Sequence, residues 1–271
     1  MDQRTAIEQK SGTADNGRLG APPKKGKGRG QGAINICLAI ALTVFCGCVA
    51  LAIYSQTVDL HHTREEIASL PVPVPVPEAT DLAEAPVPLA EAAAQPHSSE
   101  FDAEMRGINP DYICWLKIDD TEISYPVVRG EDNETYLGMS FYGESNYFGS
   151  LFMDYRCMGD SVPNIIIFGH NSRQGDMFGT LRNYLNEDYL ENHPVITLVA
   201  NDRAVEYEVF SARRTNVDDP AYFLDFSEPG AFGGFLERCG APADAAQVLT
   251  LSTCVSGDDK DERVIVQGAL R

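Results

Sequence analysis

The sequence predicts a mostly β domain, a barrel or a sandwich, in residues 101–271, preceded by one N-terminal transmembrane helix. Short apolar or alternating runs recur between turn signals along residues 101–271. Aromatic residues are absent from residues 71–100 and return at Phe101, where the folded domain is expected to begin. An uncharged apolar stretch fills residues 33–54. Together these features indicate one domain of ordinary size attached to a membrane.

The predicted strands are rich in β-branched and aromatic residues and are separated by Gly, Pro, Asn or Asp. They cover residues 114–118, 123–128, 150–153, 164–168, 195–200, 205–212, 248–254 and 264–270. Two helical pieces are expected between them. In residues 176–185, apolar side chains recur at helical spacing, and residues 227–239 begin with a Ser cap and an early Pro.

Residues 33–54 are long enough to cross a bilayer as a helix, at about 1.5 Å per residue. A cleaved signal peptide is one alternative, because Ala50-Leu51-Ala52 resembles a cleavage site. However, the apolar core of a signal peptide is usually only about 7–15 residues long. A buried helix of a soluble protein is the other alternative. We expect a retained anchor.

The charge is unevenly distributed along the chain. The formal net charge is −19, with residues 1–32 carrying +4, residues 55–100 carrying −7 and residues 101–271 carrying −16. A basic segment before an apolar span predicts a cytoplasmic tail in residues 1–32 and an extracellular location for the residues beyond the span. The acidic charge of residues 101–271 argues against nucleic acid as a partner.

Two segments connect the span to the domain. Residues 55–70 can continue as a juxtamembrane helix, in which the adjacent His61 and His62 do not face one another and are not expected to share a metal. Residues 71–100 are rich in Pro, Ala and Glu and predict an extended spacer without a core. A ligand for a Pro-binding domain is the alternative for this spacer.

The cysteines predict no metal site. Three of the seven lie in the apolar stretch, and the others show no CxxC or Cys/His metal-ligand spacing. Neither a metal nor any other cofactor is therefore expected. Cys114 is expected in the core, Cys157 in a polar loop and Cys239 at a helix end, whereas Cys254 ends an apolar strand just before an acidic loop.

His170, Cys254 and Arg263 form a candidate catalytic set. His170 and Cys254 each follow an apolar strand, and Arg263 opens the final strand nine residues after Cys254. A thiol needs a base or a cation nearby to act as a nucleophile at neutral pH, and a cation can also stabilise an oxyanion. The alternatives are a buried Cys254 that acts only as a small hydrophobe and an Arg263 that pairs with surface carboxylates. His193 is expected to have a packing or capping role.

The motifs TLSTC (250–254), RVIVQGAL (263–270) and FGHN (168–171), together with a single anchor, resemble the sortases of Gram-positive bacteria, most closely class B. Further matching segments are residues 108–119, 123–128, 132–137 and 168–184. The resemblance implies an eight-stranded sortase-type β-barrel. The helix expected in residues 227–239 fits the place where class B members carry one.

The resemblance also implies a cysteine transpeptidase. Cys254 would be the nucleophile, His170 the general acid/base and Arg263 the residue that stabilises the oxyanion. The enzyme would cleave a C-terminal sorting signal after Thr, form a thioacyl intermediate and transfer the surface protein to an amine of the peptidoglycan precursor. A pilin Lys is the alternative acceptor. Candidate substrate-binding residues are Asn133, Leu137, Ser252 and Thr253, for which turn chemistry and strand packing are the alternatives.

Two features depart from the class, namely the long Pro-rich spacer and the acidic loop in residues 255–262. A catalytically inactive binding module on a stalk is the alternative from another functional class. A papain-like protease is disfavoured, because here His precedes Cys and the Cys ends a strand.

Overall fold

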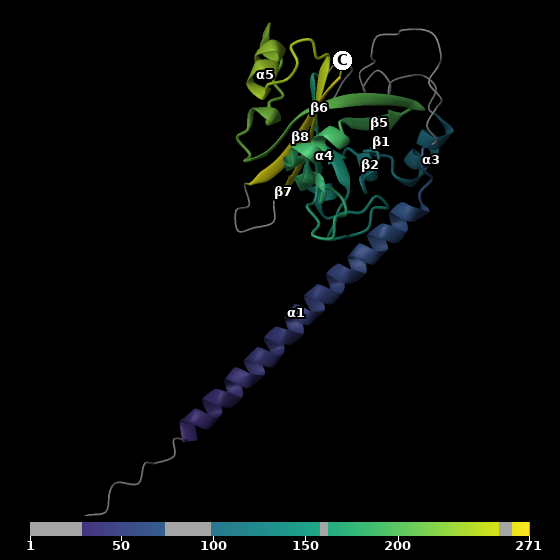
Figure 1. Ribbon diagram of the computed structural model, residues 1–271. Coiled ribbons are helices and arrows are strands. Elements are labelled where there is room, and N and C mark those ends of the chain that lie inside the picture. The colour runs from purple at the N-terminus through teal and green to yellow at the C-terminus, as the bar shows by residue number, and fades with distance from the viewer. Residues whose placement is uncertain (1–28, 74–98, 158–161, 255–261, 271) are drawn as a thin grey trace, which may run out of the picture. The chain divides into compact units, whose positions relative to one another are not determined.

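The computed structural model describes residues 29–73, 99–157, 162–254 and 262–270 (Figure 1). The chain forms two compact units, residues 1–51 and residues 52–271. Most of the predicted basic tail, most of the Pro-rich spacer and nearly all of the acidic loop lie outside the described residues.

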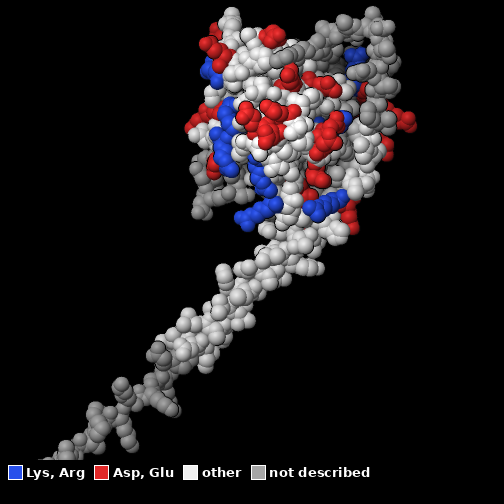
Figure 2. Space-filling model, viewed as in Figure 1, with Lys and Arg blue, Asp and Glu red and all other residues white. Residues whose placement is uncertain are grey.

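The apolar stretch belongs to a single helix, α1 (Arg29–Ser69). This helix includes both the predicted span and the predicted juxtamembrane helix. Its most apolar window has a mean hydropathy of 2.8, so by length and composition α1 can cross a membrane. Figure 2 shows the apolar stretch of α1 without acidic or basic side chains.

Residues 101–271 contain a closed barrel of eight strands, as the sequence predicts. Around the barrel the strands follow the order β1-β2-β3-β4-β7-β8-β6-β5. The pairs β2–β3 and β4–β7 are parallel, and the other neighbours are antiparallel. The strands are β1 (Tyr112–Lys117), β2 (Ser124–Val128), β3 (Leu151–Met153), β4 (Asn164–Gly169), β5 (Val195–Ala200), β6 (Arg203–Thr215), β7 (Gln247–Cys254) and β8 (Arg263–Leu270).

The barrel interior is filled by aliphatic and aromatic side chains from all eight strands. Leu116, Ile167, Leu198 and Leu251 are fully buried in this core. Each such side chain contributes about 1.5–3 kcal/mol through burial. Acidic side chains spread over the outer face shown in Figure 2, where many of the basic side chains gather along one side.

The helices around the barrel differ from the sequence prediction in three places. Helix α3 (Glu100–Ile108), which is capped by Ser99, is not among the predicted elements. Residues 176–185 do not form one helix, because Met177 has a positive φ of 52° and only η2 (Leu181–Leu185), a 3₁₀ helix, is regular. Helix α5 (Ala231–Cys239) begins later than expected, after Gly230 at φ 81°.

The prediction that Ser227 caps the helix expected in residues 227–239 is therefore wrong. The hydroxyl of Ser227 donates to Asp225 at 2.6 Å instead. The remaining short elements are η1 (Thr135–Leu137), α4 (Glu187–Asn192) and η3 (Pro220–Tyr222). His193 caps α4, and its Nδ1 lies 2.8 Å from the carbonyl oxygen of Tyr189, which confirms the expected capping role.

Three cysteines of the barrel domain are buried free thiols. Cys114 lies in the main core as predicted, and Cys239 ends α5. Cys157, expected in a polar loop, is instead a buried member of the same core. Burial raises the pKa of Cys157 to about 11, and it also raises the pKa values of Cys114 and Cys239. These thiols are thus protonated and unreactive at neutral pH.

Five polar side chains are joined by hydrogen bonds across the barrel wall and form a ring with the backbone of η3. Its members come from β4, β6, β7, β8 and the segment after β6, and they are Asn164, Thr250, Gln267, Arg213 and Asp219. We call this set the polar ring. Successive hydrogen bonds measure 3.1 Å (Thr250 to Asn164), 3.1 Å (Gln267 to Thr250), 2.9 Å (Arg213 to Gln267) and 2.6 Å (Arg213 to Asp219).

The polar ring closes through η3. Asp219 accepts a hydrogen bond from the backbone N–H of Ala221, and Asn164 donates to the backbone carbonyls of Ala221 and Phe223. Burial alone would raise the pKa of Asp219, but hydrogen bonds from Arg213, Thr215 and the Ala221 N–H outweigh it and hold the pKa below its usual range. The ring therefore fixes η3 on the barrel.

Asp219→Asn should destabilise the protein by about 2 kcal/mol at pH 7, because it removes a charge-assisted pair and leaves Arg213 without a carboxylate partner. A carboxyl group with a depressed folded-state pKa contributes stability above its unfolded pKa of about 3.9 and loses it as the pH falls further. The difference between wild type and variant should therefore narrow below about pH 4. Urea unfolding of the detergent-solubilised chain, followed by the fluorescence of Trp115, measures both effects. An equal difference at pH 3 and pH 7 would contradict the assignment.

Candidate active site

Strand pairing brings the three candidate catalytic residues to one end of the barrel. Gly169 of β4 is the parallel partner of Thr253 of β7, so His170 and Cys254 each follow a paired position. Cys254 is in turn the antiparallel partner of Arg263 at the start of β8. Residues paired directly across antiparallel strands have Cα atoms about 4.5–5.5 Å apart. Three strand ends thus meet at one edge.

A cleft of about 200 Å³ opens at this edge. It is lined by candidate residues and by several others, namely Asn133, Leu137, Phe152, Phe168, Gly169, His170, Ser252, Thr253 and Arg263. All four candidate substrate-binding residues therefore line the same cleft as His170 and Arg263. Cys254 contributes its backbone to this edge, and its side chain lies outside the described residues.

His170 is held by the segment between β2 and β3. Its Nε2 lies 2.7 Å from the carbonyl oxygen of Leu137 in η1. The ring of Tyr147 stacks on the imidazole, with centroids 6.4 Å apart and an interplanar angle of 27°. One edge and one face of the imidazole are thereby fixed by residues from outside its own strand.

Two glycines permit this close approach. A Cβ at Gly169 would collide with Leu151 and Phe178, so the FGHN motif requires glycine for packing beside His170. Gly149 has a φ of 57°, and a Cβ there would collide with the carbonyl oxygens of Tyr136 and Leu137. Because residue 149 has no side chain, nothing at this position displaces the Leu137 carbonyl that faces His170.

Asn133 lines the cleft and also ties two loops together. Its Oδ1 accepts a hydrogen bond from the backbone N–H of Tyr155 at 3.0 Å. The turn itself is stabilised by Asp132, which accepts from the N–H groups of Glu134 and Thr135. The side chain that stabilises the turn is therefore Asp132, whereas Asn133 joins the turn to the segment after β3.

Ser252 and Thr253 lie at the floor of the cleft and are nearly fully buried. The Ser252 hydroxyl lies 2.8 Å from the Tyr222 hydroxyl. The Tyr222 ring also stacks on Phe168, with centroids 6.4 Å apart. Tyr222 in η3 thus contacts residues two positions before both Cys254 and His170, and it ties the long β6–β7 connection to the cleft.

Arg263 reaches the cleft from the first position of β8. Its Nη1 donates to the backbone carbonyl of Glu262 at 2.9 Å, while the Glu262 carboxylate lies 3.4 Å from Arg214. The salt bridge of Glu262 is therefore made with Arg214. Asp261, the other neighbouring carboxylate considered from the sequence, lies outside the described residues.

One group in the described part of the chain has the donor types of a metal site. Ligand atoms of His62, Glu66 and Glu144 lie within 4.8 Å of one another, and none of these three residues lines the cleft. Glu66 already accepts a hydrogen bond from Ser140 and lies 3.3 Å from His62. Burial raises the pKa of Glu66.

Tyr147, Tyr222, Phe152 and Phe168 are not singled out by the sequence. Each is an ordinary aromatic residue in its local context, and Tyr222 is separated from Ser252 by 30 residues. Only the closed barrel brings Phe152 and Phe168 to the cleft and places Tyr147 against His170 and Tyr222 against Ser252. The FGHN motif is a partial signal, because it contains Phe168.

A family model of the sortase domain matches residues 116–271. Sortase B of Listeria monocytogenes is 33% identical over 178 residues, which cover 62% of this chain and 72% of the relative. The solved structure of sortase B from B. anthracis is 26% identical with a TM-score of 0.62, covering 79% of this chain and 98% of that chain. Sortase B from Clostridium perfringens is 28% identical with a TM-score of 0.57, covering 62% and 98%. The matched region includes every residue that lines the candidate active site.

Gly149→Ala should lower the free energy of unfolding by about 2–3 kcal/mol, because it combines a left-handed backbone with a steric collision. Gly138→Ala in the same segment is the matched control, since Gly138 has a φ of −127° and open space where a Cβ would lie. The control should change stability by at most about 0.5 kcal/mol. Equal effects of the two substitutions in a urea unfolding experiment would refute this account of Gly149.

Proposed function

The chain belongs to the sortase family, and we propose that Cys254, His170 and Arg263 are its catalytic residues. The chain is a class B-like cysteine transpeptidase of the kind that anchors surface proteins. The observation that carries the assignment is the register of β4, β7 and β8, which brings the three strand ends to one cleft. In this proposal the enzyme cleaves a C-terminal sorting signal after Thr.

The first half-reaction forms a thioacyl enzyme. The Cys254 thiolate attacks the carbonyl carbon of the signal's Thr, and the C–N bond to the next residue breaks as the tetrahedral intermediate collapses. The imidazolium of His170 gives its proton to the departing amine. The Arg263 guanidinium, on the neighbouring strand, stabilises the negative oxygen of the intermediate.

The second half-reaction transfers the acyl group to an amine. The incoming amine attacks the thioester carbonyl, the neutral His170 imidazole takes a proton from the attacking nitrogen, and the C–S bond breaks to release the Cys254 thiolate, which restores the thiolate and the imidazolium. An amine of the peptidoglycan precursor is the proposed acceptor. Limited access of water to the thioester favours the amine over hydrolysis.

We assign the rest of the cleft to the sorting signal. Leu137, with 42% of its surface exposed, offers an apolar wall, and Phe152 and Phe168 extend that wall. Asn133 stands at the rim on a segment fixed by Tyr155. Ser252 and Thr253 support the floor beside the nucleophile. A peptide bound along this cleft would present its backbone carbonyl to the end of β7.

We also propose that α1 anchors the enzyme in the membrane through residues 33–54, with the N-terminus in the cytoplasm and the catalytic domain outside. The apolar window of α1 supports the anchor. The basic residues before it and the acidic residues after it support the orientation. Surface proteins and wall precursors would then meet the enzyme at the outer face of the membrane.

Cys254→Ala should abolish the covalent adduct with sorting-signal peptides, because no other described thiol lines the cleft. The full chain in detergent is incubated with LPxTG-, NPxTN- and SPxTG-like peptides, and the adduct is read by intact-protein mass spectrometry. Gly-based, diaminopimelate-based and Lys-based amines are then offered in turn. Cys239→Ala, which removes a buried thiol, is the matched control and should retain the adduct.

His170→Gln should lower the transpeptidation rate by about 10²–10⁴-fold and Arg263→Lys by about 10²–10³-fold. Full labelling of the Cys254→Ala chain would overturn the proposed nucleophile. Equal consumption of peptide with and without amine would instead indicate a protease. Transfer of the acyl group to the Lys-based amine, and to neither of the other amines, would favour pilin assembly over wall anchoring.

A further inference from the structure

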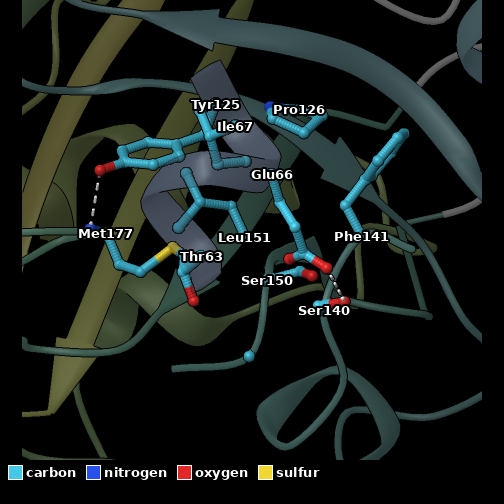
Figure 3. Close-up of a pocket in the computed structure, with 11 residues that line it drawn as sticks. Thr63, Glu66, Ile67, Tyr125, Pro126, Ser140, Phe141, Ser150, Leu151 and Met177 are labelled. Atoms are coloured by element: carbon cyan, nitrogen blue, oxygen red, sulfur yellow. Dashed lines mark hydrogen bonds between the residues drawn. The ribbon is translucent and has the colours of Figure 1, made fainter. Parts of the chain in front are cut away.

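The last turns of α1 pack against the barrel as part of the catalytic unit. Thr63 is 3% exposed, and Leu60 and Ile67 pack against the main core. Figure 3 shows Thr63 and Ile67 on the helix facing the side chains of Tyr125, Leu151 and Met177. Residues on the opposite side of the helix, such as Glu65, are exposed. This segment therefore has a buried face and a solvent face.

Arg64 connects this helix to the loop that carries His170. Its Nε and Nη2 donate to the two carboxylate oxygens of Asp176, at 2.8 and 3.0 Å. Such a bidentate pair fixes orientation as well as distance. The Asp176 side chain is only 10% exposed, whereas the Arg64 side chain is 55% exposed, so the guanidinium covers the carboxylate of the loop from the solvent side. Asp176 follows His170 by six residues.

The loop after His170 has a conformation that needs external support. Met177 is held at a φ of 52°, a region that non-glycine residues occupy only when surrounding contacts fix them. Its N–H donates to the Tyr125 hydroxyl at 3.1 Å, as Figure 3 shows. The loop then returns to the catalytic residue, since the Phe178 N–H donates to the His170 carbonyl and Asn171 bridges to Met177.

The same helix also holds the second segment that contacts His170. Asn146 donates to the Thr63 hydroxyl at 2.8 Å, and Ser140 donates to Glu66 at 3.2 Å. Figure 3 shows Glu66 directed toward Ser140. This segment, residues 138–150, begins directly after Leu137, whose carbonyl contacts the His170 Nε2, and it contains Tyr147, whose ring stacks on the imidazole.

We propose that the C-terminal turns of α1 are a positioning element for His170 and that Arg64 is a positioning residue acting through Asp176. The helix binds the loop that follows His170, which contacts the His170 backbone, and the segment whose Tyr147 ring stacks on the imidazole, so it fixes the imidazole relative to the end of β7. This inference rests on the proposed catalytic role of His170. It assigns to a juxtamembrane helix a part in the chemical step in addition to its part in the anchor.

The test compares variants of the full chain in detergent. Arg64→Gln and Asp176→Asn should each lower kcat by about tenfold with KM within twofold, because misplacing a catalytic group affects turnover more than binding. The double variant should be no worse than either single variant, since both remove the same pair. Glu65→Gln, on the exposed face, is the matched control and should retain wild-type kcat. Thermal unfolding of each variant monitors folding.

Hydrogen exchange gives a readout that does not depend on activity. Arg64→Gln should speed backbone exchange in residues 171–177 and 138–150, whereas Glu65→Gln should not. If Arg64→Gln leaves backbone exchange in these segments unchanged, or speeds it while kcat stays at the wild-type value, the positioning role is wrong. Additive losses in the double variant would also overturn it. If the wild-type chain forms no adduct, the proposed function is wrong, and so is the chemical step that Arg64 is inferred to support. The exchange data would still test whether the contact between Arg64 and Asp176 orders the loop.

Discussion

The parallel pairing of β4 with β7, next to the antiparallel pairing of β7 with β8, is the constraint on which the site depends. It brings His170, Cys254 and Arg263 to one edge although they are separated by up to 93 residues. A slip of one residue in either pairing would turn the side chains of a strand to the opposite face. The buried aliphatic residues of β4 and β7 make such a slip costly. Core packing and active-site geometry are therefore determined by the same contacts.

The strands and the candidate catalytic residues could be predicted from the sequence because their signals are local. Val, Ile and Leu runs bounded by turn residues identify all eight strands. His170 and Cys254 stand out because each ends such a run, and Arg263 because it begins one. The family resemblance then supplies Asn133, Leu137, Ser252 and Thr253, which line the cleft together. The roles of these residues remain proposals.

The rest of the site depends on contacts between distant segments. No local pattern indicates that the Leu137 carbonyl meets the His170 ring, or that Tyr222 reaches Ser252. The helix predicted in residues 176–185 does not form because Met177 adopts a left-handed backbone, which tertiary contacts impose against its own preference. Likewise, the sequence predicts a juxtamembrane helix in residues 55–70 but gives no signal that Thr63 and Ile67 face the barrel.

The polar ring has a consequence for how the domain folds. Asn164 and Thr250 are 86 residues apart, and Asn164 lies 57 residues before Ala221. No two neighbouring strands can complete the ring alone, because its bonds require β4, β7, β8 and β6 to be side by side. Contacts of such long sequence separation carry a high loop-closure cost and slow folding. The ring therefore closes late, with the barrel itself, and a nascent chain lacking β8 cannot yet complete the ring that fixes η3 beside the nucleophile strand.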